Sequence, residues 1–263
     1  MDAGDAFDHP WDLLDAGRPE DALRWLAERA ADGAPHPEGA ALACLAHLDL
    51  GDLEAAGAAL GAAPTDGRED DAATALARGE LALAHWRPDA ARVAFERAQG
   101  LAPSAHQCLR LALCADLADD RAAAERWTAA ARALDADGAG PVHVDEAVFE
   151  HLLAEAAAEL PGPFAARLDQ VPVLVEPVPT FAATGPDVPP DTLGLFRGAS
   201  DLDGSEFEAF VDLPAAIHLY QRNLERRARS HAELREEIRI TLFHELGHLL
   251  GFDEDGVDAM GLA

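Results

Sequence analysis

The stretch SHAELREEIRITLFHELGHLLG, residues 230–251, predicts a long helix that organises the second half of the chain. Ser230 followed by Glu233 has the spacing of a capping box, in which the two side chains bind the first free amides of a helix. Gly251 is a common helix terminator, because glycine readily adopts the left-handed backbone found there. The pattern therefore predicts one continuous helix with a defined start and end.

Upstream of this helix, the sequence predicts another helix and a small sheet. Residues 146–160 form an amphipathic pattern followed by Pro161, which cannot continue a helix. Segments rich in β-forming residues and bounded by proline or glycine then predict three short strands. These strands lie within residues 170–178, within 191–198 and around 217–220. The second half is therefore predicted to be a small α+β domain.

The first half of the chain repeats a helix–turn–helix pattern. Blocks that begin with a turn start at Gly17, Gly51, Trp86 and Ala118, with a period of about 34 residues. Each block follows an Ala- and Leu-rich helix and continues as a second, amphipathic helix. The pattern resembles the tetratricopeptide repeat over about residues 9–138, and an irregular alanine-rich bundle is the alternative.

The two patterns meet at a break in the helical periodicity. Gly138, Gly140 and Pro141 interrupt that periodicity. We therefore predict tetratricopeptide-like helical repeats in residues 1–138 and a second domain in residues 139–263. The predicted fold class is mainly α, with a helical-repeat solenoid followed by a small α+β domain.

Composition and charge exclude several classes of protein. Apolar residues form 49% of the 263 residues, enough to bury a core, so wholesale disorder is excluded. The formal net charge is −29, from 49 acidic residues against 20 basic ones. A surface this acidic repels phosphate backbones and anionic lipids. We therefore expect no nucleic-acid partner and no membrane partner.

Cysteine usage and the N-terminal sequence predict a reduced compartment. Cys44, Cys108 and Cys114 lie in Ala- and Leu-rich stretches without a CxxC spacing, which is typical of buried free thiols. The first residues, MDAGDAFDHPWDLL, have neither the basic nor the apolar region of a signal peptide. No apolar stretch approaches the length that spans a bilayer. We therefore expect a cytoplasmic protein.

The sharpest chemical signal is the motif HELGH at residues 244–248, inside the long predicted helix. His244 and His248 are four positions apart, so both imidazoles lie on one helical face and can bind one Zn²⁺. Glu245 lies one position along, where its carboxylate can take a proton from a metal-bound water. Zinc lowers the pKa of that water and polarises a scissile carbonyl. We therefore predict His244 and His248 as metal ligands and Glu245 as the catalytic residue.

A third protein ligand is predicted just after the helix. Gly251 ends the helix and lets the chain turn back towards the metal. The spacing of an extended HExxHxxGxx pattern then selects Glu254 as the third metal ligand. The flanking residues Asp253 and Asp255 are alternatives, and so is a water molecule.

Over residues 144–261 the chain resembles the minimal zincin-type metallopeptidase family of bacteria. The resemblance rests on ELPGPFAARLDQVPVLVE, TLGLFRG and AIHLYQRNLERRARSHAELREEIRITLFHELGHLLGFDEDGVDAMGL, in this order. It implies a compact α+β zincin fold and a zinc-dependent peptidase, without a known substrate. Members of that family usually carry Asp at the position of Glu254, so the resemblance leaves the identity of the third ligand open.

The motif and the resemblance together predict a zinc metallopeptidase that hydrolyses a peptide or protein through a metal-activated water. The helical repeats are predicted to recruit the substrate or a protein partner. Residues 193–196 are interpreted either as an edge strand that pairs with an extended peptide or as a plain core strand. The alternative function is a non-catalytic repeat adaptor with a zinc-stabilised domain. Glu245 favours the enzyme, because a structural zinc site needs no base.

Overall fold

The structure is a computed structural model of the chain. It describes residues 7–32, 36–62, 71–135, 140–198 and 215–252. The chain divides into two compact units, Met1–Leu134 and Asp135–Ala263, which are called unit 1 and unit 2 below. The predicted boundary at Gly138 lies outside the described residues. None of the described helices is long and apolar enough to cross a bilayer.

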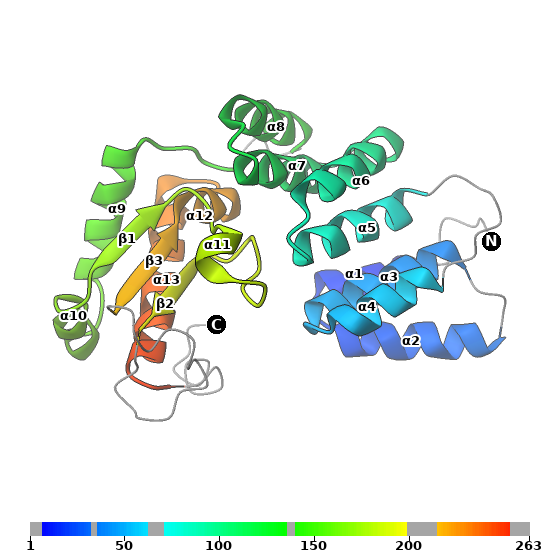
Figure 1. The fold of residues 1–263 in the computed structure, drawn as a ribbon, viewed down its shortest axis with the longest axis horizontal. Coiled ribbons are helices and arrows are strands. Elements are labelled where there is room, and N and C mark those ends of the chain that lie inside the picture. The colour runs from blue at the N-terminus through cyan, green and yellow to red at the C-terminus, as the bar shows by residue number, and fades with distance from the viewer. Residues whose placement is uncertain (1–6, 33–35, 63–70, 136–139, 199–214, 253–263) are drawn as a thin grey trace. The chain divides into compact units, whose positions relative to one another are not determined.

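Unit 1 is helical in its described part (Figure 1). Its helices are α1 (Asp8–Asp15), α2 (Pro19–Asp32), α3 (Pro37–Asp49), α4 (Leu53–Gly61), α5 (Ala72–Ala84), α6 (Pro88–Leu101), α7 (Ala105–Leu117) and α8 (Arg121–Leu134). Each helix packs against the next one along the chain, and α3 also packs against α5. The side chains of Asp52, Asp71 and Ser104 cap α4, α5 and α7 by accepting a hydrogen bond from a first-turn amide.

Four turns in unit 1 share the same backbone conformation. The residues Gly17, Gly51, Trp86 and Asp119 all have a positive φ, between 53° and 74°. Two main-chain amides in each turn donate back to carbonyl oxygens of the preceding helix, which is how a helix ending on a left-handed residue satisfies its last carbonyls. The predicted helix–turn–helix period is therefore present in the backbone. The assignment to tetratricopeptide-like repeats stays a prediction.

The interior of unit 1 is filled largely by small side chains, which lets its helices approach closely. Phe95 of α6 is fully buried against Gly79 of α5. A Cβ at position 79 would lie 2.4 Å from the Phe95 ring, so glycine is required for this contact.

A half-buried ion pair joins α5 to α7. The Glu80 carboxylate accepts a hydrogen bond from Arg110 and lies 3.4 Å from Nε2 of His106. Burial acts to raise the pKa of Glu80, but the Arg110 charge and the contacts with His106 outweigh it and hold that pKa below its ordinary 4.5. Glu80 is therefore ionised at neutral pH and contributes stability that depends on its charge.

Unit 2 combines helices with a small sheet. Its described helices are α9 (Glu146–Ala158), α10 (Gly162–Leu168), α11 (Phe181–Thr184), α12 (Gln221–Arg227) and α13 (His231–Leu249), and its strands are β1 (Val173–Glu176), β2 (Gly194–Arg197) and β3 (Ala216–Tyr220). The strand order is β1-β3-β2, with β1 parallel and β2 antiparallel to β3. Each predicted strand is present, and the predicted fold class is confirmed.

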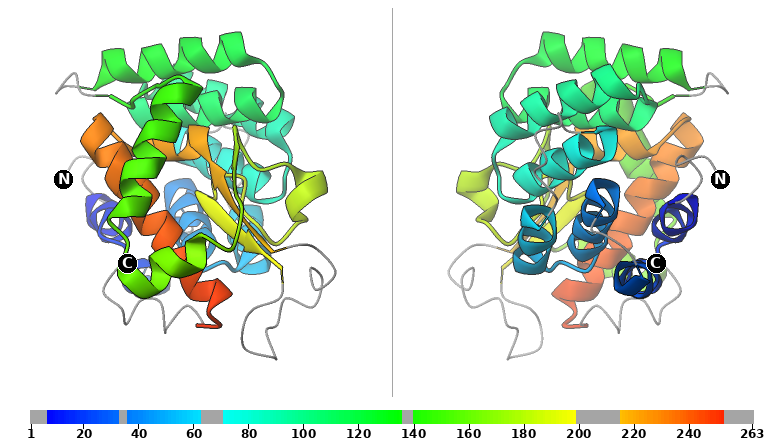
Figure 2. Two further views of the ribbon diagram at one scale, coloured as in Figure 1. Left: turned by 90° about the vertical axis from the view of Figure 1, so that its left-hand side faces the viewer. Right: turned by 90° about the vertical axis from the view of Figure 1, so that its right-hand side faces the viewer.

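The core of unit 2 holds the long helix α13 against the sheet. Helix α13 packs on β2 and β3, and α9 packs against α13 (Figure 2). Ile217 and Leu219 of β3 are fully buried in one core with Phe149 of α9. Phe164 of α10 stacks on Phe243 of α13 with 4.2 Å between ring centroids. Neighbours on several sides therefore fix the position of the helix that carries the HELGH motif.

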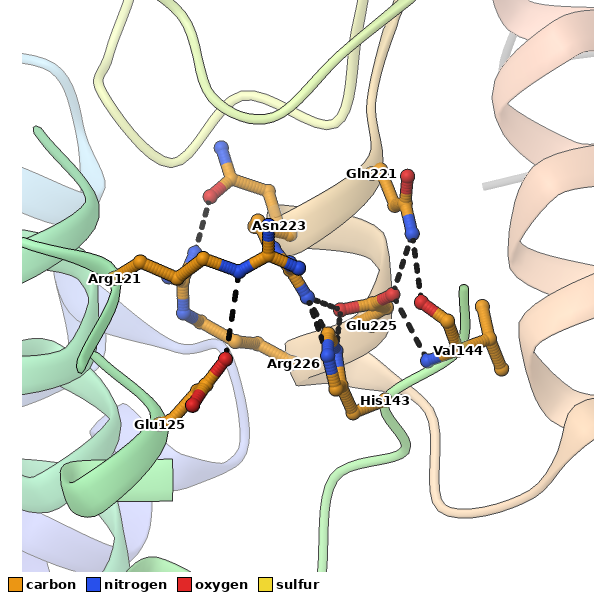
Figure 3. Close-up of polar contacts among 9 residues, drawn as sticks. Arg121, Glu125, His143, Val144, Gln221, Asn223, Glu225 and Arg226 are labelled. Atoms are coloured by element: carbon orange, nitrogen blue, oxygen red, sulfur yellow. Dashed lines mark hydrogen bonds and ion pairs between the residues drawn. The ribbon is translucent and has the colours of Figure 1, made fainter. Parts of the chain in front are cut away.

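A buried carboxylate on α12 fastens the start of unit 2 (Figure 3). Oε1 of Glu225 accepts hydrogen bonds from the main-chain amide of Val144 at 3.2 Å and from Nε2 of Gln221 at 2.8 Å. Oε2 lies 2.9 Å from Nη1 of Arg222 and 3.0 Å from Nδ1 of His143. Because the Glu225 side chain is only 4% exposed, these contacts hold the segment before α9 firmly in place.

Helix α11 lies within residues 179–190, between the first two strands, where no helix was predicted from the sequence. The structure forms one short helix inside this segment. Thr184 stabilises it by donating its hydroxyl to the carbonyl oxygen of Thr180 at 3.0 Å. A helix of one turn has no apolar period in its sequence, so the periodicity argument could not find it.

Candidate metal centre

Helix α13 has the ends that its sequence predicts. The hydroxyl of Ser230 accepts a hydrogen bond from the amide of Glu233 at 3.1 Å. The Glu233 carboxylate reaches back to the amide of Arg229 at 2.8 Å, one residue before the cap. At the other end Gly251 has a φ of +87°, and the amide of Phe252 donates into the last turn at 3.0 Å. The helix therefore ends within one turn of the HELGH motif.

The two histidines of the motif converge on one point. Nε2 of His244 lies 3.0 Å from Nε2 of His248. Two nitrogens bound to a tetrahedral zinc ion at ~2.0–2.1 Å lie about 3.3 Å apart. Both side chains are half-buried, so the rings are held but remain accessible. The spacing and chemistry of these two donors therefore fit a zinc ion.

The far side of the second imidazole contacts the turn that ends the helix. Nδ1 of His248 lies 3.2 Å from the main-chain carbonyl oxygen of Phe252. A carbonyl oxygen only accepts, so Nδ1 is the donor in this contact, and Nε2 is the ring nitrogen that faces His244. The turn after the helix thus orients the His248 ring as well as ending the helix.

The carboxylate of the motif lies against the sheet. Glu245 is 6% exposed, and its Oε2 accepts a hydrogen bond from the main-chain amide of Phe196 at 2.6 Å. Glu245 follows His244 on α13, so it occupies the adjacent helical face. The structure thus places the predicted base next to the histidine pair.

Strand β2, which supplies that amide, lies at one edge of the sheet formed by the described strands. The first of the two interpretations of residues 193–196 requires this edge position, and the pairing with an extended peptide stays a prediction. Gly194 and Phe196 of this strand both lie against Glu245, a contact that was not predicted from the sequence. The available signal was a glycine inside a predicted strand, which often marks a close approach of another group.

The predicted third ligand, Glu254, lies outside the described residues, as do Asp253 and Asp255. Within the described ranges no cluster of three or more His, Cys, Asp or Glu side chains could hold a metal ion. Of the three predicted ligands, His244 and His248 lie within the described residues, and their role as metal ligands stays a prediction.

Residues 168–262 match the family model described as zincin-like metallopeptidase. The matched range covers the sheet and the whole of α13 but leaves out unit 1 and α9. No curated protein matches the chain. The matched range includes the HELGH motif at residues 244–248.

Proposed function

We propose that unit 2 is a zinc-dependent metallopeptidase that hydrolyses peptide bonds. His244 and His248 would hold the zinc ion, and Glu245 would act as the general base. One observation carries the proposal: the two Nε2 atoms lie 3.0 Å apart, and the neighbouring side chain on the helix is a buried carboxylate. The family match over residues 168–262 supports the same chemistry.

Each residue of the motif has a distinct task in this reaction. Bound zinc supplies a Lewis acid that polarises the scissile carbonyl and acidifies the attacking water. The Glu245 carboxylate accepts the proton of that water and can return it to the leaving amine. The carbonyl of Phe252 contacts Nδ1 of His248, on the far side of the ring from the proposed zinc site, and so orients that ring.

We also propose that Glu254 completes the ligand set, as the spacing of the motif predicts. Separate Glu254→Ala, Asp253→Ala and Asp255→Ala variants test this by zinc titration. The true ligand should lose a decade or more of zinc affinity, and the two other variants should lose far less. A uniform small loss would show that the three carboxylates act only through general electrostatics, and would contradict the assignment.

A role of unit 1 in recruiting a peptide or protein partner is part of the same proposal. It rests on the repeated turns, because arrays of helix–turn–helix units present extended binding surfaces.

Zinc binding by the full chain tests the site directly. His244→Ala should lower the zinc affinity by at least one decade in isothermal titration. His231→Ala is the matched control, because His231 is exposed and lies at the opposite end of the same helix from the motif. Equal zinc affinity in both variants would contradict the proposed site. Bound zinc without hydrolysis of any peptide would favour the non-catalytic adaptor.

A further inference from the structure

Strand β2 and helix α13 approach each other very closely at one residue. A Cβ atom at Gly194 would lie 2.5 Å from Cγ2 of Thr241 and 3.2 Å from Cγ of Glu245. Atoms in a packed interior do not come within 2.5 Å of each other without a shift of the structure. The backbone φ of Gly194 is not positive, so a larger residue could adopt the same backbone. Lack of space for a side chain therefore explains why a glycine occupies this position.

The close approach brings a main-chain donor to the carboxylate of Glu245. The amide of Tyr220 donates to the carbonyl oxygen of Leu193 at 2.9 Å, so the polar groups of Leu193 face β3. Main-chain groups alternate in direction along a strand, so those of Phe196 face away from β3. The amide of Phe196 donates instead to Oε2 of Glu245 at 2.6 Å, and hydrogen bonds to charged acceptors are shorter than those between neutral groups.

We propose that Gly194 and the main-chain amide of Phe196 position the Glu245 carboxylate beside the histidine pair. Gly194 acts as a positioning residue, because it lets the strand lie close enough for the amide to reach the carboxylate. Phe196 contributes its main chain rather than its side chain. The meaning of this arrangement for catalysis rests on the proposed function, whereas the contact itself does not depend on it.

The anchor limits the freedom of a flexible side chain. A glutamate has several rotamers, and ordering it costs conformational entropy. Because the Phe196 amide already holds the Glu245 carboxylate, this entropy is lost on folding and not when a substrate binds. Accurate placement of a reacting group can change a rate by two orders of magnitude for a displacement of about 1 Å. A shift of β2 should therefore affect turnover much more than zinc binding.

Amide NMR of the ¹⁵N-labelled full chain tests the contact without any need for activity. The Phe196 amide proton should resonate far downfield and exchange slowly with solvent. In Glu245→Ala it should move upfield and exchange about tenfold faster or more, the factor that a hydrogen bond to a charged group contributes. Gly194→Ala should do the same, whereas Leu195→Ala, whose main-chain groups face β3, should leave the Phe196 amide unchanged. An unchanged Phe196 amide in Glu245→Ala would overturn the proposal.

A compensating change separates positioning from general damage to the fold. Thr241→Ser removes the methyl group that a Cβ at position 194 would strike, and it keeps the hydroxyl. The double variant Gly194→Ala/Thr241→Ser should therefore recover most of the Phe196 amide shift and slow exchange. Failure of the double variant to recover them, with Glu245→Ala folded as wild type, would overturn the role of Gly194.

Zinc titration and turnover of the same proteins distinguish this inference from the proposed function. Gly194→Ala should keep its zinc affinity within about twofold, while kcat falls about tenfold or more. If the wild-type protein binds zinc and is active, but the Phe196 amide signal is the same in Glu245→Ala, the inference is overturned and the proposed function stands. A protein with the expected amide response but neither zinc binding nor hydrolysis would support the contact and overturn the proposed function.

Discussion

Replacing Glu225 by alanine should destabilise unit 2 strongly. The substitution removes the acceptor for the Val144 amide and Gln221, and it leaves the charge of Arg222 without the carboxylate beside it. Removal of one partner from a buried ion pair costs ~3–5 kcal/mol. The Arg222 side chain is 16% exposed and that of His143 is 36% exposed, so water can reach both after the change. We therefore expect a loss near the lower limit, ~3 kcal/mol.

Thermal unfolding of the full chain, followed by near-UV circular dichroism, measures this loss. A change of ~3 kcal/mol corresponds to a fall of about 10 °C in the Tm of a domain of this size. Glu236→Ala is the matched control, because Glu236 makes an ion pair with Arg239 on the exposed surface of α13. We expect that variant to change the stability by less than ~0.5 kcal/mol. Equal Tm values for the two variants would refute the reasoning.

Three further predictions concern unit 1. Asp119 is an exposed residue with a φ of +57°, so Asp119→Gly should raise the free energy of unfolding by ~0.5–1 kcal/mol in urea; a decrease would contradict this. The pKa of Glu80 is lower in the folded state than its ordinary value of 4.5. The Glu80 charge therefore stabilises unit 1 fully at pH values above 4.5, and this stabilisation is lost as the pH falls through the pKa of the folded state. Glu80→Gln should therefore flatten the fall in stability with acid below the ordinary pKa of 4.5, and an unchanged fall would count against the ion pair. Burial, with the Glu80 charge as a smaller cause, raises the pKa of the Cys44 thiol to about 11, so iodoacetamide at neutral pH should label Cys44 only after unfolding.

Local signals predicted the long helix and its motif well. Each of these signals involves residues only a few positions apart. They are the cap at Ser230, the terminator Gly251 and the spacing of His244 and His248. Capping and helical periodicity act over that distance, so one sequence is enough to see them. The structure confirms the helix and brings the two Nε2 atoms together.

Contacts between distant residues could not be predicted in the same way. Glu225 binds the amide of Val144 from 81 positions away, and Glu245 binds the amide of Phe196 from 49 positions away. Both contacts depend on how the sheet, α12 and α13 pack, which no local pattern encodes. A glycine inside a strand indicates that another group comes close, but the sequence does not identify that group as Thr241 and Glu245 of α13.

The most direct test of the central claim is cleavage of an unbiased peptide library by the zinc-loaded full chain. Wild-type protein should cleave peptides, and a chelator should stop the cleavage. Glu245→Gln should retain its zinc but lose hydrolysis by at least two orders of magnitude, because it keeps the shape of the side chain and removes the proton acceptor. A Glu245→Gln variant that cleaves the library as fast as wild type, or a wild-type protein that binds zinc and cleaves nothing, would contradict the account.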